Sequence, residues 1–282
     1  MSIPFPAYPA IIGLLFSVQV VAQEADTPAA IENKEFNPAT LMWYETPAEN
    51  WEEALPVGNG RLGAMVFGAY GEERIQMNEE SYWSGGPYST VVEGGAEALP
   101  EIQKLLFDGK PLEAHRLFGR HLMGYPVEQQ KYQSLANLHL FFDKQEEVSD
   151  YTRWLDLETG ITGVEYTVGD TRYRREVIAS APDQVILVRL TVSKPGSISF
   201  RAQLRGCRNQ AHSNYATDYF RMDAVDQDGL VVTGKSADYL GVEGAIRYRA
   251  QLQAFSEGGS MEVDGIDLII ENADTVIPVS YT

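Results

Sequence analysis

The sequence predicts a mostly β protein: a β-sandwich interrupted by two short helices at about residues 97–123. Three observations predict this fold. From Leu138 onward, apolar residues recur at every second position, as in strands with one solvated face. Turn-forming residues separate these runs at close intervals, as they do in sandwiches. Residues 97–123 instead space their apolar side chains as helices do.

The predicted elements follow from local signals. Strands at 62–70 and 73–78 pair through a turn at Gly71. Helices cover 97–108 and 111–123, because Gly109 suits the end of the first and Pro111 the first turn of the second. The remaining strands are predicted at 138–142, 163–168, 171–180, 184–193, 197–204, 230–234, 245–256, 261–263, 267–271 and 275–281.

Composition excludes several classes of function. Hydrophobic residues make up 44% of the 282 residues, which is typical of a globular chain with a buried core. The net charge is −18, with 40 acidic and 22 basic residues. Nucleic-acid binding needs clustered cations, and the one local group, at 172–175, is interpreted as a solvated strand face paired with carboxylates. The acidic balance also argues against anionic membranes and fits neutral substrates such as sugars.

Metal and cofactor sites are not expected. Cys207 is the single cysteine, so neither an intrachain disulfide nor a cysteine-based metal site can form. We interpret it as a buried or half-buried thiol. His115 and His121 lie six positions apart, on different sides of a helix, so they lack metal-ligand spacing.

The N-terminus predicts export. Residues 10–22 form an apolar run that ends in Val20-Val21-Ala22, which is typical of a signal peptide over 1–22. The run is too short to span a bilayer. The segment before it has no lysine or arginine, which leaves a buried N-terminal segment as the alternative. We predict cleavage after Ala22, a periplasmic or extracellular location, a flexible lead-in over 23–40 and one β-rich domain over 41–282.

Two segments carry the most specific chemistry. The turn at 56–60 can supply positive φ through glycine and asparagine, and it leads into a strand of small residues. Farther on, an amide, a carboxylate and an indole occur within six positions, a mixture that sugar sites favour. The alternative is a turn plus a structural tryptophan at a sheet edge or a domain contact. The candidate substrate- or partner-facing residues are Asn59, Arg61, Asn78, Glu79 and Trp83.

These segments resemble the start of glycoside hydrolase family 95, the α-L-fucosidase type. The resemblance rests on Trp-Tyr at 43–44, Ala-Leu-Pro-Val-Gly-Asn-Gly-Arg-Leu-Gly-Ala at 54–64 and Trp-Ser-Gly-Gly-Pro at 83–87. Further similar segments lie at 99–110, 132–138, 155–160, 173–177 and 182–186, so it covers about residues 41–281. Ala136 stands where the family usually has glycine.

The resemblance implies an N-terminal β-super-sandwich followed by a linker and an (α/α)6 barrel. It also implies an inverting glycosidase, in which an acid protonates the leaving oxygen and a water attacks from the opposite face. Those catalytic groups belong to the barrel, so no catalytic residue is assigned here. The barrel is the expected partner, and a fucosylated glycan is a further candidate. The last predicted strand stops one residue before the sequence does, which suggests a truncated chain.

Three functions remain open at this point: a non-catalytic domain of an exported fucosidase-type enzyme, a stand-alone carbohydrate-binding sandwich, and a purely structural domain. Adjacent Glu79 and Glu80 point to opposite faces of a strand and cannot flank one bond, so we expect no activity from the chain alone. A domain that sits against a barrel should expose an apolar or aromatic patch. Trp83, residues 84–87, Asn59 and Arg61 are the candidates for that surface.

Overall fold

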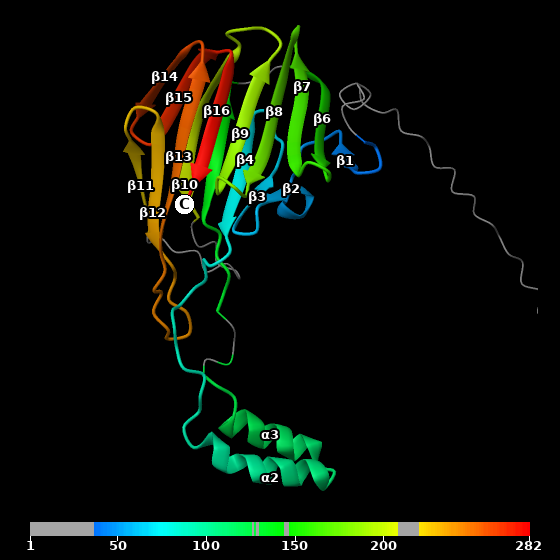
Figure 1. The fold of residues 1–282 in the computed structure, drawn as a ribbon, viewed down its shortest axis with the longest axis vertical. Coiled ribbons are helices and arrows are strands. Elements are labelled where there is room, and N and C mark those ends of the chain that lie inside the picture. The colour runs from blue at the N-terminus through cyan, green and yellow to red at the C-terminus, as the bar shows by residue number, and fades with distance from the viewer. Residues whose placement is uncertain (1–36, 126, 128–129, 144–146, 208–219) are drawn as a thin grey trace, which may run out of the picture.

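Two antiparallel β-sheets pack face to face in the computed structural model, which describes residues 37–125, 127, 130–143, 147–207 and 220–282 (Figure 1). The nine-stranded sheet has the order β1 (Leu41–Tyr44), β6 (Val148–Asp156), β7 (Ile161–Val168), β8 (Thr171–Ser180), β9 (Val185–Val192), β16 (Thr275–Tyr281), β13 (Arg247–Glu257), β12 (Gly229–Lys235), β11 (Phe220–Val225). The seven-stranded sheet has the order β14 (Ser260–Asp264), β15 (Asp267–Ala273), β10 (Ile198–Gly206), β5 (Ala136–Phe142), β4 (Glu72–Glu79), β3 (Leu62–Val66), β2 (Leu55–Gly58). The predicted mostly β sandwich is confirmed.

The core lies between the two sheets, where every second side chain of a strand turns inward. β13 follows the rule clearly: Ala250, Leu252 and Ala254 are fully buried, while the residues between them lie toward solvent. On the facing sheet, Leu138 and Leu140 of β5 are buried in the same alternating way. The period of two in the sequence is therefore the signature of a one-sided core.

Four of the observed strands were not predicted from the sequence. β1, β2 and β11 are edge strands, which pair with a neighbouring strand on one side only. A weak alternating pattern is therefore tolerated in them. β6 carries Arg153 and Asp156 in its buried half, so it lacks an alternating apolar pattern. Arg153 is satisfied by the carbonyls of Thr46 and Glu53, each at 2.7 Å. Long-range hydrogen bonds of this kind leave no local signal in the sequence.

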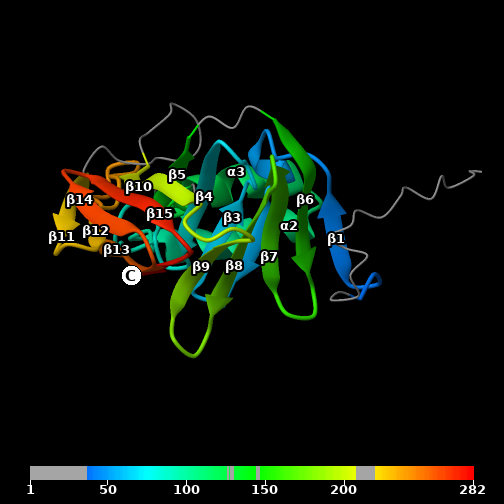
Figure 2. The same ribbon diagram turned by 90° about the horizontal axis from the view of Figure 1, so that it is seen from above.

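The two-helix insertion is present, with α2 at Gly95–Phe107 and α3 at Pro111–His121. Gly109 ends α2 with φ +72°, where the N–H groups of Gly109 and Lys110 donate to Leu106 and Leu105 at 3.1 and 2.9 Å. This is a Schellman motif, and Pro111 then starts α3 as expected. The hairpin projects from one end of the sandwich on two long connections (Figure 1), and Figure 2 places it beneath the sheets.

A buried ion pair joins the sheets. Arg175 of β8 contacts the Glu73 carboxylate of β4, and the two side chains are 3% and 0% exposed. Glu73 also accepts hydrogen bonds from the backbone N–H groups of Phe67 and Gly68, at 3.1 and 3.0 Å. Burial raises the pKa of Glu73, while the guanidinium and the two N–H groups oppose that rise.

Residues 1–36 lie outside the described part of the chain, and so does the predicted signal peptide with most of the lead-in. Positions 37–40 form a turn whose Thr40 carbonyl accepts a hydrogen bond from Leu157 at 2.9 Å. Within the described ranges, no helix has the length and apolar character needed to cross a bilayer. Nor does any cluster of three or more His, Cys, Asp or Glu residues there have metal-binding geometry.

Candidate functional site

The turn between β2 and β3 builds one corner of the candidate site. Gly60 takes φ +95°, while the Asn59 side-chain oxygen accepts hydrogen bonds from the N–H groups of Arg61 and Leu62 at 3.0 and 2.7 Å. The Asn59 side-chain amide donates to the carbonyl of Ser180 at the end of β8, at 2.8 Å. Asn59 therefore fixes the turn and ties the two sheets together.

Arg61 reaches across this end of the sandwich. Its Nε donates to Gln184 Oε1 and its Nη1 to Thr282 Oγ1, both at 2.7 Å. The Glu79 carboxylate lies 3.8 Å from the guanidinium. That carboxylate also accepts from the N–H and hydroxyl of Ser81, at 2.8 and 2.6 Å. Because the Glu79 carboxylate is engaged by three groups from two neighbours, Arg61 and Ser81, its geometry serves positioning.

Trp83 lies beside this group but has a structural role of its own. Its indole N–H donates to the carbonyl of Glu80 at 2.9 Å, and its ring meets Tyr132 edge-on with centroids 5.2 Å apart. Burial, with the nearby carboxylates of Glu79 and Glu80, raises the pKa of Tyr132. The indole is thus held at the root of the connection that leads to the helices.

The loop at 84–87 is packed inside the protein at its first residues. The N–H of Ser84 donates to Lys131 and that of Gly85 to Ala237, at 2.8 and 2.6 Å. A Cβ on Gly86 would stand 2.8 Å from Cβ of Ala245, so only glycine allows this approach. The two consecutive glycines of the motif therefore serve packing.

Asn78 is separated from the other candidates. It is half-buried on β4, opposite Gly63 of β3. It belongs to the alternate positions of β4 whose side chains point away from the core. Successive side chains of a strand point to opposite faces, so Asn78 and Glu79 diverge. The structure brings Asn59, Arg61, Glu79 and Trp83 to one end of the sandwich, and we call these four residues the end cluster.

A small cavity of about 220 Å³ opens beside the end cluster and includes Arg61, Glu79, Tyr82 and Thr282 in its lining. Most polar groups around it already bond to one another. Among the described residues around this cavity, no pair of free carboxylates is available for acid–base chemistry.

Exposed apolar side chains gather on the helical hairpin and its two connections, a surface that the sequence patterns did not indicate. In the part of the chain that the structure describes, nine of the seventeen exposed large hydrophobic residues fall between positions 91 and 127. Phe107 is 89% exposed and Leu112 is 75% exposed. Only Ile102 and Ala114 are buried hydrophobic residues of the two helices. The sequence signal available for this surface was that both helices carry apolar residues on more than one side.

Comparisons with known proteins agree with the sequence motifs. A family model described as "Glycosyl hydrolase family 65, N-terminal domain" matches residues 42–280. "Alpha-L-fucosidase 2" of Arabidopsis thaliana is 35% identical over 182 residues, which cover 64% of this chain and 21% of that protein. "Probable alpha-fucosidase A" of Aspergillus niger is 35% identical over 167 residues, which cover 55% of this chain and 20% of that protein.

Among solved structures, the "Putative kojibiose phosphorylase from human microbiome" aligns with 86% of this chain and 32% of its own, at 8% identity and a TM-score of 0.46. The chain spans about a fifth of the length of the two fucosidase relatives named above.

Proposed function

This chain belongs to the glycosyl hydrolase family 65 N-terminal domain family, and on that premise we propose that it is the non-catalytic N-terminal domain of an exported α-L-fucosidase-type hydrolase. The fucosidase names of its relatives and the family 95 motifs support the substrate class. The apolar run before Ala22 supports export. In this proposal the domain docks on the catalytic (α/α)6 barrel of the same enzyme.

The exposed hairpin is the observation that carries the docking role. Two helices of 13 and 11 residues with two buried apolar residues between them cannot be stable through their own packing. Burying a side chain such as Phe107 or Leu112 against a partner would contribute about 1.5–3 kcal/mol each. The hairpin therefore gains its stability from a surface outside the described part of this chain.

Geometry supports the same direction of docking. Thr282 lies at the end of the sandwich from which the hairpin projects, and Arg61 of the end cluster binds its side chain (Figure 1). In a longer enzyme of the relatives' kind, the polypeptide after position 282 would leave from this end. A barrel placed there would meet the hairpin and the end cluster together.

Cross-linking of such a full-length enzyme tests the proposal. Lys104 and Lys110 lie on the hairpin and should form cross-links with lysines beyond position 282, identified by mass spectrometry. Lys194, between β9 and β10, is the control. It follows Val192, the last residue of β9, whereas Gln184, which binds Arg61, comes just before the first residue of that strand. Lys194 is therefore at the end of β9 away from the end cluster. Cross-links from Lys194 to the barrel, with none from the hairpin, would contradict the docking geometry.

The enzyme class has a separate test. The full-length enzyme should release the aglycone from an aryl α-L-fucoside, and the sugar product should form with inverted configuration. Retention of configuration, or turnover of other aryl glycosides alone, would contradict this part of the proposal. The docking result would stand in either case.

A further inference from the structure

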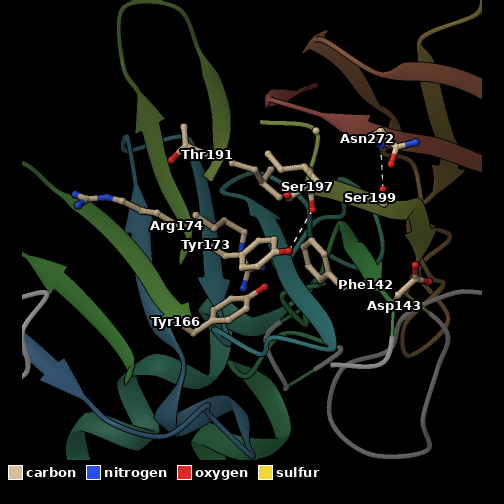
Figure 3. Close-up of a pocket in the computed structure, with 13 residues that line it drawn as sticks. Phe142, Asp143, Tyr166, Tyr173, Arg174, Thr191, Ser197, Ser199 and Asn272 are labelled. Carbon is tan, nitrogen blue, oxygen red and sulfur yellow. Dashed lines mark hydrogen bonds between the residues drawn. The ribbon is translucent and has the colours of Figure 1, made fainter. Parts of the chain in front are cut away.

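A second cavity of about 330 Å³ lies between the sheets, away from the end cluster (Figure 3). Strands β5, β7, β8, β9 and β10 and the end of β15 line it. Phe142 lines the cavity, and the residue before it pairs with Glu72, the first residue of β4. Glu79 of the end cluster is the last residue of β4, at the other end of that strand. The cavity and the docking surface are therefore different sites.

Aromatic rings form one side of the cavity. Tyr166 and Tyr173 are equidistant from the two-residue turn between β7 and β8, so they pair across the strands. Their rings stack with centroids 5.3 Å apart and an interplanar angle of 10°. Figure 3 shows both rings and Phe142 turned toward a common space. Flat apolar rings beside hydroxyl groups suit a ligand with one C–H face and several polar substituents.

The two arginines that line the cavity are each paired with a carboxylate, and the lining also includes the carboxylate of Asp143. Arg174 Nη2 binds Glu176 at 2.8 Å, and its Nη1 lies 3.7 Å from Glu165. Arg175 is paired with the buried Glu73. Since both guanidinium groups already face carboxylates, the cavity has no surplus positive charge for an anion. This balance favours a neutral ligand.

Polar groups remain available for such a ligand. Arg175 is 2% exposed, and its Nε–H has no acceptor among the described residues. A buried donor without an acceptor costs about 1–3 kcal/mol, so an oxygen placed near it by a ligand would relieve that cost. The lining also holds the hydroxyls of Thr191 and Ser199 and the side chain of Asn272.

We propose that this cavity binds a neutral saccharide, at the scale of one terminal sugar unit. The aromatic side would take the apolar face of the ring, and the polar lining would take its hydroxyls. The choice of a sugar agrees with the proposed function but rests on the cavity's own chemistry. The site would give the domain a carbohydrate-binding role that does not depend on docking.

Titration of the 282-residue chain with L-fucose, D-galactose and D-glucose tests the proposal, with inorganic phosphate as the anionic probe. We expect saturable NMR shift changes for at least one sugar and none for phosphate. Tyr173→Ala should weaken sugar binding at least about fivefold through loss of the stacked ring. Tyr173→Phe keeps the ring, so the affinity for the sugar should change by less than about twofold. The two variants together separate the contribution of the ring from that of the hydroxyl, which donates to Ser197.

Phe255→Ala is the matched control, because Phe255 is an exposed aromatic residue on β13 outside the cavity. It should leave sugar binding unchanged. Failure of all three sugars to bind would overturn the proposal. So would phosphate binding in their place, or sugar binding that Tyr173→Ala leaves intact but Arg61→Ala abolishes. Loss of the docking cross-links alone would contradict docking and not this site.

Discussion

At the scale of the residue, the structure uses charged side chains as internal connections between the sheets. Arg175 and Glu73 come from different sheets, and they meet where the core would otherwise be apolar. The sequence analysis interpreted the arginines at 172–175 as a solvated face paired with carboxylates. Arg174 fits that interpretation, since it pairs with Glu176 and is partly exposed, but Arg175 is a correction because it points into the core.

Removing one member of the buried pair should be strongly destabilising. Arg175→Met leaves the Glu73 carboxylate uncompensated, so the free energy of unfolding should fall by about 3–5 kcal/mol in urea titrations. Arg201→Met is the control, because the Arg201–Asp267 pair at 3.1 Å is partly exposed and should cost no more than about 1 kcal/mol. Equal losses for the two variants would contradict the importance of burial.

Cys207 should be chemically unreactive in the folded chain. Burial raises the pKa of its thiol to about 12, so almost no thiolate exists at pH 8. The thiol is half-buried, as predicted. We expect slow alkylation by iodoacetamide at pH 8 and fast alkylation in denaturant, with mass spectrometry counting the single adduct. Complete labelling of the native chain within minutes would show that the thiol is accessible and ionised.

At the scale of the element, the helical hairpin is the part least supported by its own contacts. Its turn is well formed, with Gly109 and Pro111 in the conformations that their positions require. Its apolar residues are nevertheless mostly exposed. Local signals thus specify the helices, whereas most of their apolar side chains make few contacts within the described part of the chain.

Polar substitution on the hairpin should change association and not the sandwich. The double variant Phe107→Ser/Leu112→Ser removes two side chains that touch little in this chain, so the unfolding free energy of the sandwich should move by less than about 0.5 kcal/mol. Binding of a hydrophobic dye, and self-association in analytical ultracentrifugation, should both decrease. Phe255→Ser, a lone exposed aromatic residue on β13, should reduce neither by as much. If the double variant left dye binding unchanged, the apolar surface that binds the dye would lie outside the hairpin.

At the scale of the whole molecule, the domain divides its features between two regions. The end cluster and the hairpin lie at one end, and the aromatic cavity lies toward the other. Among the described residues, neither region brings two free carboxylates together across a space that a glycosidic bond could occupy. Hydrolysis with inversion needs an acid and a base on opposite sides of that bond.

The purified chain should therefore not hydrolyse aryl α-L-fucosides. Continuous assays at pH 5 to 8 should give the same aglycone release as buffer alone. Glu79→Gln should leave that background unchanged, because Glu79 is bound by Ser81 and Arg61. Turnover that Glu79→Gln abolishes would assign catalysis to this domain and overturn the non-catalytic role proposed for it.

Local sequence patterns predicted the fold class, the two helices and twelve of the sixteen strands in the part of the chain that the structure describes. They could do so because alternation and turn residues act locally, as in β13 and at Gly109. They also pointed to Asn59, Arg61, Glu79 and Trp83, which share one end of the sandwich, but they could not separate Asn78 from them.

The remaining features depend on contacts between segments that are far apart in the sequence. Arg175 meets Glu73, Arg61 meets Gln184 and Tyr173 borders a cavity with Phe142 because sheets built from distant segments face each other. No local pattern records which strand of one sheet lies opposite which strand of the other. The direction of the hairpin likewise depends on the long connections that hold it away from the sheets. Pairings of this kind form only when the whole chain packs, and they create both the end cluster and the aromatic cavity.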